Sequence, residues 1–281
     1  MIQNLIISGG GYHIFKIYGM LNKLQKKNIF NMNDIKSIHG VSAGSIIGTI
    51  LCLKMNNDEL LNYYINRPWE KDIKIEPENF LNLFHKNGIL DNNFFEIILN
   101  KLLLSKNLKK DINLLEFYKY SNIELYIYSL SINTIKYTSF SYKTHPNLKL
   151  IDAIYMSSTL PFIFQPKFLN NSYMLDGGLL NHFPYFLCKE KEEEILGVLI
   201  KKKYIDIENN SSLIKLYTGF FNNLLIFLNL NNYEKIKKKK NIFIYNVDFF
   251  DKDLLVNLIN KKKTREEEIK KGENLIDNYF D

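Results

Sequence analysis

At 281 residues, the chain is long enough for one large α/β domain with a well-filled core, or for two smaller domains. Hydrophobic residues make up 46% and charged residues 24%, which is ordinary globular usage and excludes a chain that is disordered throughout. The net charge of +7 lies largely in lysine runs that have no interleaved aromatic residues and no recognition motif, so we expect no nucleic-acid partner.

Residues 1–7 carry no basic leader, no long apolar core and no cleavage site, so we expect no secretory signal. Two cysteines, Cys52 and Cys188, cannot build a disulfide framework and fit no metal-binding spacing, which suits a reducing compartment. We therefore expect an intracellular, cytoplasmic protein, and its basic charge is compatible with peripheral attraction to anionic membranes. The bias towards Lys, Asn, Ile, Tyr and Phe is typical of an AT-rich genome, such as that of a large DNA virus or a parasite.

The first third of the chain reads as the opening of a βαβ unit. An apolar strand at 2–7 runs into the glycine triplet 9–11, and a helix follows over 12–26 with apolar residues at spacings of three and four. A second short strand at 35–39 leads through Ser42 into a helix that is apolar nearly all round. We expect that helix to be buried.

The middle of the chain is mostly helical. Residues 59–121 mix polar and apolar positions, with a break at Arg67-Pro68, and we expect an inserted helical layer or lid. Alternating residues at 123–131 and 135–140 predict a hairpin, and a short helix is expected over 148–156.

The last part of the chain continues the alternation of strands and helices. Strands are expected at 195–200 and 242–247, with a long helix around 211–230 between them. The spelling Thr264-Arg265-Glu266-Glu267 is that of a capping box and predicts the start of a final helix.

No internal repeat and no linker divides the chain. We therefore expect a single domain over 1–281. Its motif-bearing part is about 1–200, and about 201–281 forms a C-terminal extension.

Apolar residues recur on one face of the helix around 211–230. Such a stripe is more often a core contact, and the alternative is an interfacial helix that carries the protein to a lipid surface. Lys215, Asn222 and Asn223 interrupt it too much for a transmembrane span, and we expect none. The stripe consists of Leu213, Leu216, Tyr217, Phe220, Leu224, Phe227 and Leu228.

The segment Gly40-Val41-Ser42-Ala43-Gly44 follows a short strand and precedes a helix, which is the spelling of a nucleophile elbow. Gly40 and Gly44 allow the sharp turn that exposes the Ser42 hydroxyl, and the helix directs its positive end at developing negative charge. The alternative interpretation of the same residues is an ordinary Gly/Ser turn before a helix.

An activated serine needs a base, and histidine is the usual one. No histidine lies in the C-terminal third, where an α/β-hydrolase carries it, so we expect a structural or surface role for each. The remaining option is a carboxylate that takes the serine proton directly. Asp176 suits it, because it ends an apolar run before Gly177 and Gly178, and partial burial would raise its pKa. The five histidines are His13, His39, His85, His145 and His182.

The triplet Gly9, Gly10 and Gly11 can offer backbone N–H groups to an oxyanion with no side chain in the way. A phosphate loop is the alternative, but the triplet lacks both Gly-x-Gly-x-x-Gly and a Walker Lys-Ser/Thr. Asp176-Gly177-Gly178 can likewise be read as an ordinary turn.

Taken in order, these motifs resemble the patatin-like phospholipases over roughly residues 1–200. The resemblance implies a three-layer α/β/α fold with a mostly parallel central sheet. It also implies a lipid acyl hydrolase with Ser42 as nucleophile, Asp176 as base and the glycine loop as oxyanion hole, and with no metal and no cofactor. After the triplet the family usually has Arg or Lys and a further glycine, where this chain has Tyr12-His13-Ile14. The matching motifs are Gly9-Gly10-Gly11, Gly40-x-Ser42-x-Gly44, Ser158-x-x-Pro161 and Asp176-Gly177-Gly178 with Asn181 and Pro184.

We therefore expect a serine acyl hydrolase that releases fatty acid from phospholipid or a related lipid ester at a membrane surface. Two alternatives stay open. One is a catalytically inactive lipid-binding or regulatory protein on the same fold, which the residues at 12–14 support. The other is an acyltransferase that passes the acyl group to a carrier or an alcohol. The residues predict neither the lipid headgroup, nor the acyl position, nor the oligomeric state.

Overall fold

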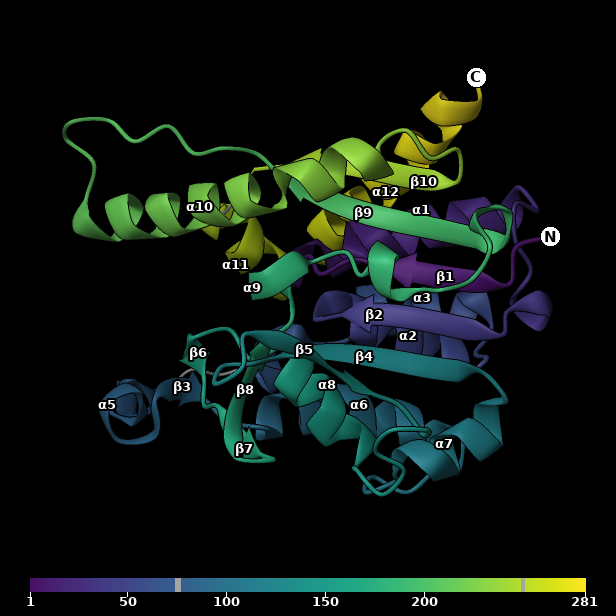
Figure 1. The fold of residues 1–281 in the computed structure, drawn as a ribbon, viewed down its shortest axis with the longest axis horizontal. Helices are drawn as coiled ribbons and strands as arrows, with labels where there is room; N and C mark the ends of the chain where they lie inside the picture. Colours follow the sequence, from purple (N-terminus) through teal and green to yellow (C-terminus); the bar gives the residue numbers. More distant parts are fainter. Residues whose placement is uncertain (74–76, 249–250) are drawn as a thin grey trace.

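The computed structural model describes residues 1–73, 77–248 and 251–281, and its centre is one large sheet (Figure 1). The sheet comprises β1 (Asn4–Ile7), β2 (Ser37–Val41), β4 (Glu124–Ser131), β5 (Lys136–Phe140), β7 (Lys167–Leu169), β8 (Ser172–Asp176), β9 (Ile195–Lys202) and β10 (Ile242–Val247). Their order is β10-β9-β1-β2-β4-β8-β7, with β5 also paired to β4. The strands from β10 to β4 run parallel, and β5, β8 and β7 are antiparallel additions. The expected α/β class with a mostly parallel sheet is confirmed.

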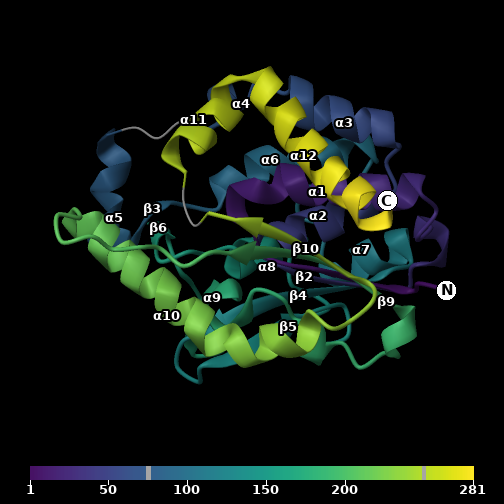
Figure 2. The same ribbon diagram turned by 90° about the horizontal axis from the view of Figure 1, so that it is seen from above.

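Helices flank both faces of the sheet. Figure 2 shows α1, α2, α3, α6 and α12 on one face and α10 with α9 on the other, which gives the expected three layers. A separate pair joins β3 (Gly88–Leu90) to β6 (Phe162–Phe164). The helices are α1 (Ile14–Lys26), α2 (Ala43–Cys52), α3 (Asn57–Asn66), α4 (Trp69–Asp72), α5 (Asn82–Lys86), α6 (Asn93–Ser105), α7 (Leu114–Ser121), α8 (Leu150–Ser157), α9 (Gly178–Asn181), α10 (Leu213–Ile236), α11 (Lys252–Asn260) and α12 (Lys262–Phe280).

The central strands are apolar on both faces because each face meets a different hydrophobic cluster. Successive side chains of a strand point to opposite sides. Leu5 and Ile7 of β1 therefore join the main core under α1 and α2, whereas Ile6 joins a smaller cluster with Phe183 and Leu199. A continuous apolar run is the pattern that a strand buried on both faces requires.

The C-terminal helix α12 packs closely against α1. A Cβ atom added to Gly19 would lie 2.1 Å from the carbonyl oxygen of Ile269, and one added to Gly272 would lie 2.2 Å from that of Lys16. The buried Lys16 ammonium also forms an ion pair with Glu268 of α12. Because β9 and β10 extend the central sheet as well, the segment beyond residue 200 shares the sheet and core of the part that carries the motifs.

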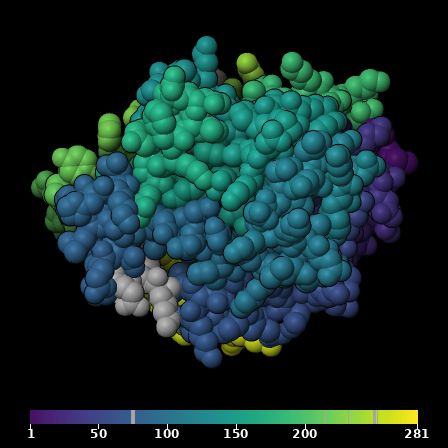
Figure 3. Space-filling view, turned by 90° about the horizontal axis from the view of Figure 1, so that it is seen from below, coloured from purple at the N-terminus to yellow at the C-terminus, as the bar shows by residue number. Residues whose placement is uncertain are grey.

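Several expected elements are confirmed, with shifted ends. The hairpin of β4 and β5 is present, and the strand expected at 35–39 runs from Ser37 to Val41. The segment 59–121 divides into separate helices and the short strand β3. Together with the hairpin, this segment forms much of the face seen from below (Figure 3).

Two expectations for the C-terminal part are wrong. The capping box at Thr264 does not form, because α12 already begins at Lys262 and Lys261 occupies the N-cap without a side-chain hydrogen bond. The apolar stripe on α10 is not a core contact, since Phe220, Phe227 and Leu228 are 60%, 65% and 63% exposed. In the part of the chain that the structure describes, no helix combines the length and apolar character needed to cross a bilayer.

Candidate active site

Ser42 lies at a tight turn between β2 and α2, with φ 53° and ψ −122°. A positive φ is strained for a residue with a side chain, and such strain is typical of a nucleophile elbow. The N–H of Ser45 donates to the Ser42 carbonyl oxygen at 2.8 Å and closes the turn. A Cβ on Gly40 would lie 2.6 Å from the Gly44 carbonyl oxygen, and one on Gly44 would lie 2.2 Å from that of Ile7. Only glycine fits at these two positions, because the backbones touch there.

The end of α8 supports the elbow and the strand that carries Asp176. The Ser157 hydroxyl accepts a hydrogen bond from the N–H of Ser42 at 2.9 Å and donates to a carbonyl oxygen of β4 at 2.6 Å. Two residues later, the Thr159 carbonyl oxygen accepts from the N–H of Asp176 at 2.8 Å. The sequence motif drew attention to Ser158, whereas its neighbours make these contacts. No local pattern signals them.

Asp176 ends β8 and is only 3% exposed. The side chain of Ser42 lies close enough to its carboxylate to lower the pKa of Asp176, and Asp176 Oδ1 accepts from the N–H of Gly178 at 2.7 Å. Burial raises the pKa of Asp176 from 3.8 to about 6, and the interactions with Ser42 and Gly178 and the Lys202 cation oppose that rise. A carboxylate with a pKa in this range can act as a general base near neutral pH. A Cβ on Gly177 would lie 2.5 Å from a carbonyl oxygen of β4, which explains the first glycine after the acid.

The glycine triplet lies beside the elbow, since a Cβ on Gly9 would be 3.5 Å from the Cβ of Ser42. The N–H of Gly9 donates to the carbonyl oxygen of His182 at 2.8 Å, so the expectation that all three glycines offer a free N–H does not hold for Gly9. Among the described residues, no acceptor takes the N–H of Gly10 or Gly11. These two groups can therefore serve an oxyanion. Gly11 also has a φ of 55°, in the left-handed region that favours glycine.

Three histidines are buried and held neutral. Burial lowers the pKa of His13, His39 and His182 to about 4. His39 packs within the sheet, where its Nδ1 is 2.7 Å from the Tyr128 hydroxyl. Within the described residues, no histidine hydrogen-bonds to Ser42, and no three His, Cys, Asp or Glu side chains are grouped so that they could hold a metal ion.

Lys202 belongs to one of the lysine runs and was not singled out from the sequence, but it stands at the site. It ends β9 next to the glycine loop, where the N–H of Ile200 donates to Ser8 Oγ at 2.9 Å and a Cβ on Gly10 would lie 3.2 Å from Ile200 Cγ1. Beyond the effect of burial, the Lys202 cation acts on the pKa of Asp176 and of His182. The sequence shows only that Lys202 follows the strand expected at 195–200.

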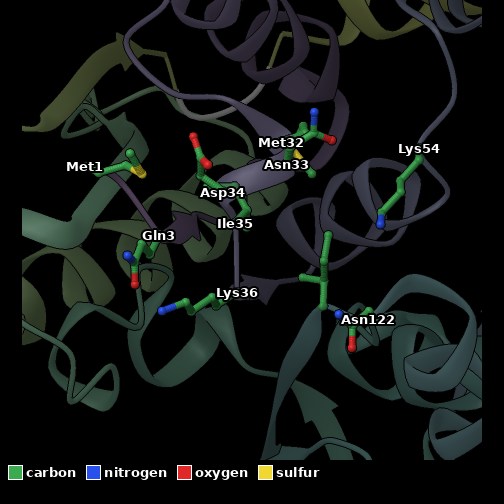
Figure 4. Close-up of a pocket in the computed structure, with 10 residues that line it drawn as sticks. Met1, Gln3, Met32, Asn33, Asp34, Ile35, Lys36, Lys54 and Asn122 are labelled. Atoms are coloured by element: carbon green, nitrogen blue, oxygen red, sulfur yellow. The ribbon is translucent and has the colours of Figure 1, made fainter.

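Two concave regions occur, and no residue lines both of them. A groove of about 480 Å³ runs between α9 and α10 and is largely apolar, and Asp176 lies two residues before α9. A pocket of about 300 Å³ is lined by Gln3, Lys36 and Ile123, which precede β1, β2 and β4 at the amino ends of these strands (Figure 4). Ser42 follows the carboxyl end of β2, so this second pocket is not part of the candidate site. The groove is lined by Leu179, Leu180, Pro184, Phe186, Leu187 and Leu228, with Tyr137, Asn181, Asn229 and Asn232.

The chain matches a family model described as "Patatin-like phospholipase" over residues 5–188. A protein of Acanthamoeba polyphaga mimivirus is 28% identical over 199 residues, which cover 70% of this chain and 65% of the relative. A protein of Invertebrate iridescent virus 6 named "Probable lipid hydrolase" is 26% identical over 214 residues, which cover 70% and 69%. The chain thus spans about two thirds of the length of these relatives. Both come from large DNA viruses, a source with which the composition of this chain is compatible.

Among solved structures, VipD from Legionella pneumophila is similar with a TM-score of 0.55 and 17% identity. The match covers 99% of this chain and 67% of VipD. At this level of identity the likeness concerns the fold alone, and it extends over the part of the chain beyond residue 200.

Proposed function

Because this chain belongs to the patatin-like phospholipase family, we propose that it is a serine acyl hydrolase that cleaves a lipid ester with the pair Ser42 and Asp176. The observation that carries the proposal is the placement of Ser42, at its strained turn, where its side chain interacts with the buried carboxylate of Asp176, whose pKa is raised to about 6. Ser42 supplies a nucleophile at a strained turn, and Asp176 supplies a base matched to neutral pH. Neither role requires a histidine, a metal ion or a cofactor.

The reaction proceeds through an acyl-serine intermediate. Asp176 takes the proton of Ser42 as its Oγ attacks the ester carbonyl carbon. The N–H groups of Gly10 and Gly11 donate to the oxyanion that forms, and the amino-terminal end of α2 favours its negative charge. The intermediate then collapses, and the departing alcohol takes the proton from Asp176. Water attacks the acyl-serine with Asp176 again as base, which releases the fatty acid and restores Ser42.

The substrate we propose is a phospholipid or related lipid ester at a membrane surface. The relative named a probable lipid hydrolase supports this class of substrate. The groove between α9 and α10 supports it too, because its apolar lining suits an acyl chain and includes Leu179 and Leu180 of α9, the helix that follows Asp176.

Fatty-acid release from mixed phospholipid vesicles tests the proposal. We expect Ser42→Ala and Asp176→Asn each to abolish release while the circular dichroism spectrum and folding stay intact. A fluorophosphonate probe should label the wild-type protein at Ser42 and leave Ser42→Ala unlabelled. Release of fatty acid by either folded variant would contradict the proposed pair.

A catalytically inactive lipid-binding protein is the second candidate, favoured by Tyr12-His13-Ile14 in place of the family's basic residue and fourth glycine. Absence of probe labelling in a folded wild-type protein that still binds lipid would select this candidate. An acyltransferase shares the same first half of the reaction. Analysis of the products in the presence of an alcohol acceptor distinguishes it from the hydrolase.

A further inference from the structure

The long helix α10 has its apolar face turned outwards. Figures 1 and 2 both place α10 at the edge of the molecule, outside the sheet. Residues at spacings of three and four along one side of it are large, apolar and exposed, which is the reverse of a helix that covers a core. Contiguous apolar surface of this kind marks an interaction site. The exposed residues are Leu213, Leu216, Tyr217, Phe220, Phe221, Leu224, Phe227, Leu228 and Leu230.

The inward face of α10 carries asparagine side chains that hydrogen-bond to the rest of the fold. Asn222 is 1% exposed and its Nδ2 donates to the Lys203 carbonyl oxygen at 3.1 Å. Asn223 makes a paired contact with Ile205: its Oδ1 accepts from the N–H at 2.8 Å and its Nδ2 donates to the carbonyl oxygen at 2.9 Å. These amides satisfy the backbone of the segment that follows β9 and thereby fix the rotation of the helix. The outward direction of the apolar residues is therefore set by specific hydrogen bonds.

The apolar face of α10 lies at the same end of the molecule as the candidate site. The parallel strands point towards this end, which also carries α5 and the pair of β3 and β6 (Figures 1 and 2). Exposed apolar residues occur there as well, including Phe84 of α5, which is 82% exposed, and Phe162 of β6, which is 72% exposed. Leu228 of α10 lines the groove next to α9, so the apolar face continues into the concave region near Asp176.

The positive charge of the chain is concentrated around α10. Residues 201–240 contain nine lysines and three acidic residues, so they carry a net +6 of the +7 for the whole chain. Lys237, at the end of α10, and Lys203, beside Asn222 in the middle of the helix, are 42% and 59% exposed and pair with the exposed carboxylates of Glu234 and Asp248. Apolar side chains flanked by exposed lysines match the interface of a bilayer that contains anionic lipid. The same charge opposes pairing of this face with a second copy of the chain.

We propose that α10 is a membrane-docking helix, whose outer face lies in the interface of an anionic bilayer. In this orientation the carboxyl ends of the parallel strands face the bilayer. The helix lies along the surface and does not cross it. The benefit of this orientation for catalysis rests on the proposed function, whereas the docking itself does not.

Vesicle flotation with the full chain carrying Ser42→Ala tests the docking without any hydrolysis. We expect this protein to float with vesicles of phosphatidylcholine and phosphatidylserine, and to float less with phosphatidylcholine alone. An ionic strength of about 1 M, where the Debye length falls to about 3 Å, should weaken the binding. The double variant Phe220→Ser/Phe227→Ser should lose about tenfold or more in vesicle affinity, because two exposed phenyl rings no longer enter the interface.

The matched control is Leu104→Ser/Tyr279→Ser, since these residues are 62% and 55% exposed on α6 and α12. It should leave vesicle affinity unchanged. A second variant, Leu216→Ser/Tyr217→Ser, keeps the test valid if the first one does not fold. Failure of the Ser42→Ala chain to float, or equal affinity of folded outer-face and control variants, would overturn the proposal. So would a dimer in solution that the outer-face substitutions dissolve, because it would assign this face to a second copy.

Activity measurements separate this proposal from the proposed function. In an otherwise wild-type chain, Phe220→Ser/Phe227→Ser should reduce hydrolysis of vesicle lipid and leave hydrolysis of a monomeric short-chain ester unchanged. If the wild-type chain binds anionic vesicles and hydrolyses neither substrate, the docking proposal stands and the hydrolase proposal fails.

Discussion

Ser157 holds Ser42 in place from a helix 115 residues further along the chain, because its hydroxyl accepts the N–H of Ser42 at 2.9 Å. The same hydroxyl donates to the Tyr128 carbonyl oxygen of β4 at 2.6 Å. One side chain thus joins the end of α8, the central sheet and the strained turn. Strain at a functional residue persists only where its surroundings fix it, and Ser157 is part of that fixation.

We predict that Ser157→Ala lowers kcat for ester hydrolysis by about tenfold and stability by about 1–2 kcal/mol, because the buried N–H of Ser42 loses its acceptor. Hydrolysis rates and urea unfolding measure the two effects. Ser158→Ala is the control, since the Ser158 Oγ is buried with no hydrogen-bond partner among the described residues. Its removal should change both quantities much less. Equal losses in the two variants would refute the role assigned to Ser157.

The pH dependence of kcat/KM should show an acidic limb near pH 6. Asp176 has a pKa raised to about 6 by burial, and it must be ionised to take the Ser42 proton, so activity falls below that pH. Lys202 opposes the rise, and its removal in Lys202→Met should therefore move the limb to higher pH. Lys203→Met is the control, because Lys203 is exposed and pairs with Asp248. A limb that stays in place in Lys202→Met would contradict this coupling.

Short sequence patterns predicted those parts of the candidate site whose residues are neighbours in the sequence. The glycines around Ser42 and the strand end at Asp176 are of this kind, because a sharp turn and a close backbone approach each demand a particular residue at a particular place. The hydrogen bond from the Ser42 N–H to Ser157 and that from the Gly9 N–H to His182 join segments that are distant in the sequence. No spacing within a window of the sequence signals such contacts.

The orientation of α10 shows a second limit of prediction from the sequence alone. The sequence displays a stripe and its interruptions, and a stripe is most often a core contact. In the structure Asn222 and Asn223, which interrupt the stripe, make hydrogen bonds to the segment after β9, and the stripe itself is exposed. Periodicity identifies the two faces of a helix, and only the rest of the fold determines which face is covered.

We predict that Asp176→Asn stabilises the fold at neutral pH while it abolishes hydrolysis. The pKa of Asp176 is about 6 in the folded protein against 3.8 for the ordinary group, so the folded state binds this proton more tightly than the unfolded state. The unfolding free energy therefore falls as pH rises through this interval, by up to about 3 kcal/mol for a shift of this size. Urea unfolding at pH 7 should show the variant more stable by about 1–3 kcal/mol, and the difference should shrink towards pH 4. A less stable variant at pH 7 would contradict the burial cost.

The close contact between α1 and α12 leads us to predict that Gly272→Ala destabilises the fold, although helix propensity alone would favour alanine. Gly272 lies inside α12, and replacing glycine with alanine in the interior of a helix ordinarily stabilises it by about 1 kcal/mol. Here the new Cβ would lie 2.2 Å from the Lys16 carbonyl oxygen, so the two helices must separate and the buried pair of Lys16 and Glu268 is disturbed. We expect Gly272→Ala to lower the unfolding free energy by about 2 kcal/mol or more. Lys270→Ala, two residues away on the exposed side of α12, is the control and should change it by less than about 0.5 kcal/mol. Chemical unfolding followed by circular dichroism measures both, and a stabilised Gly272→Ala chain would show that α12 does not pack on α1 in this way.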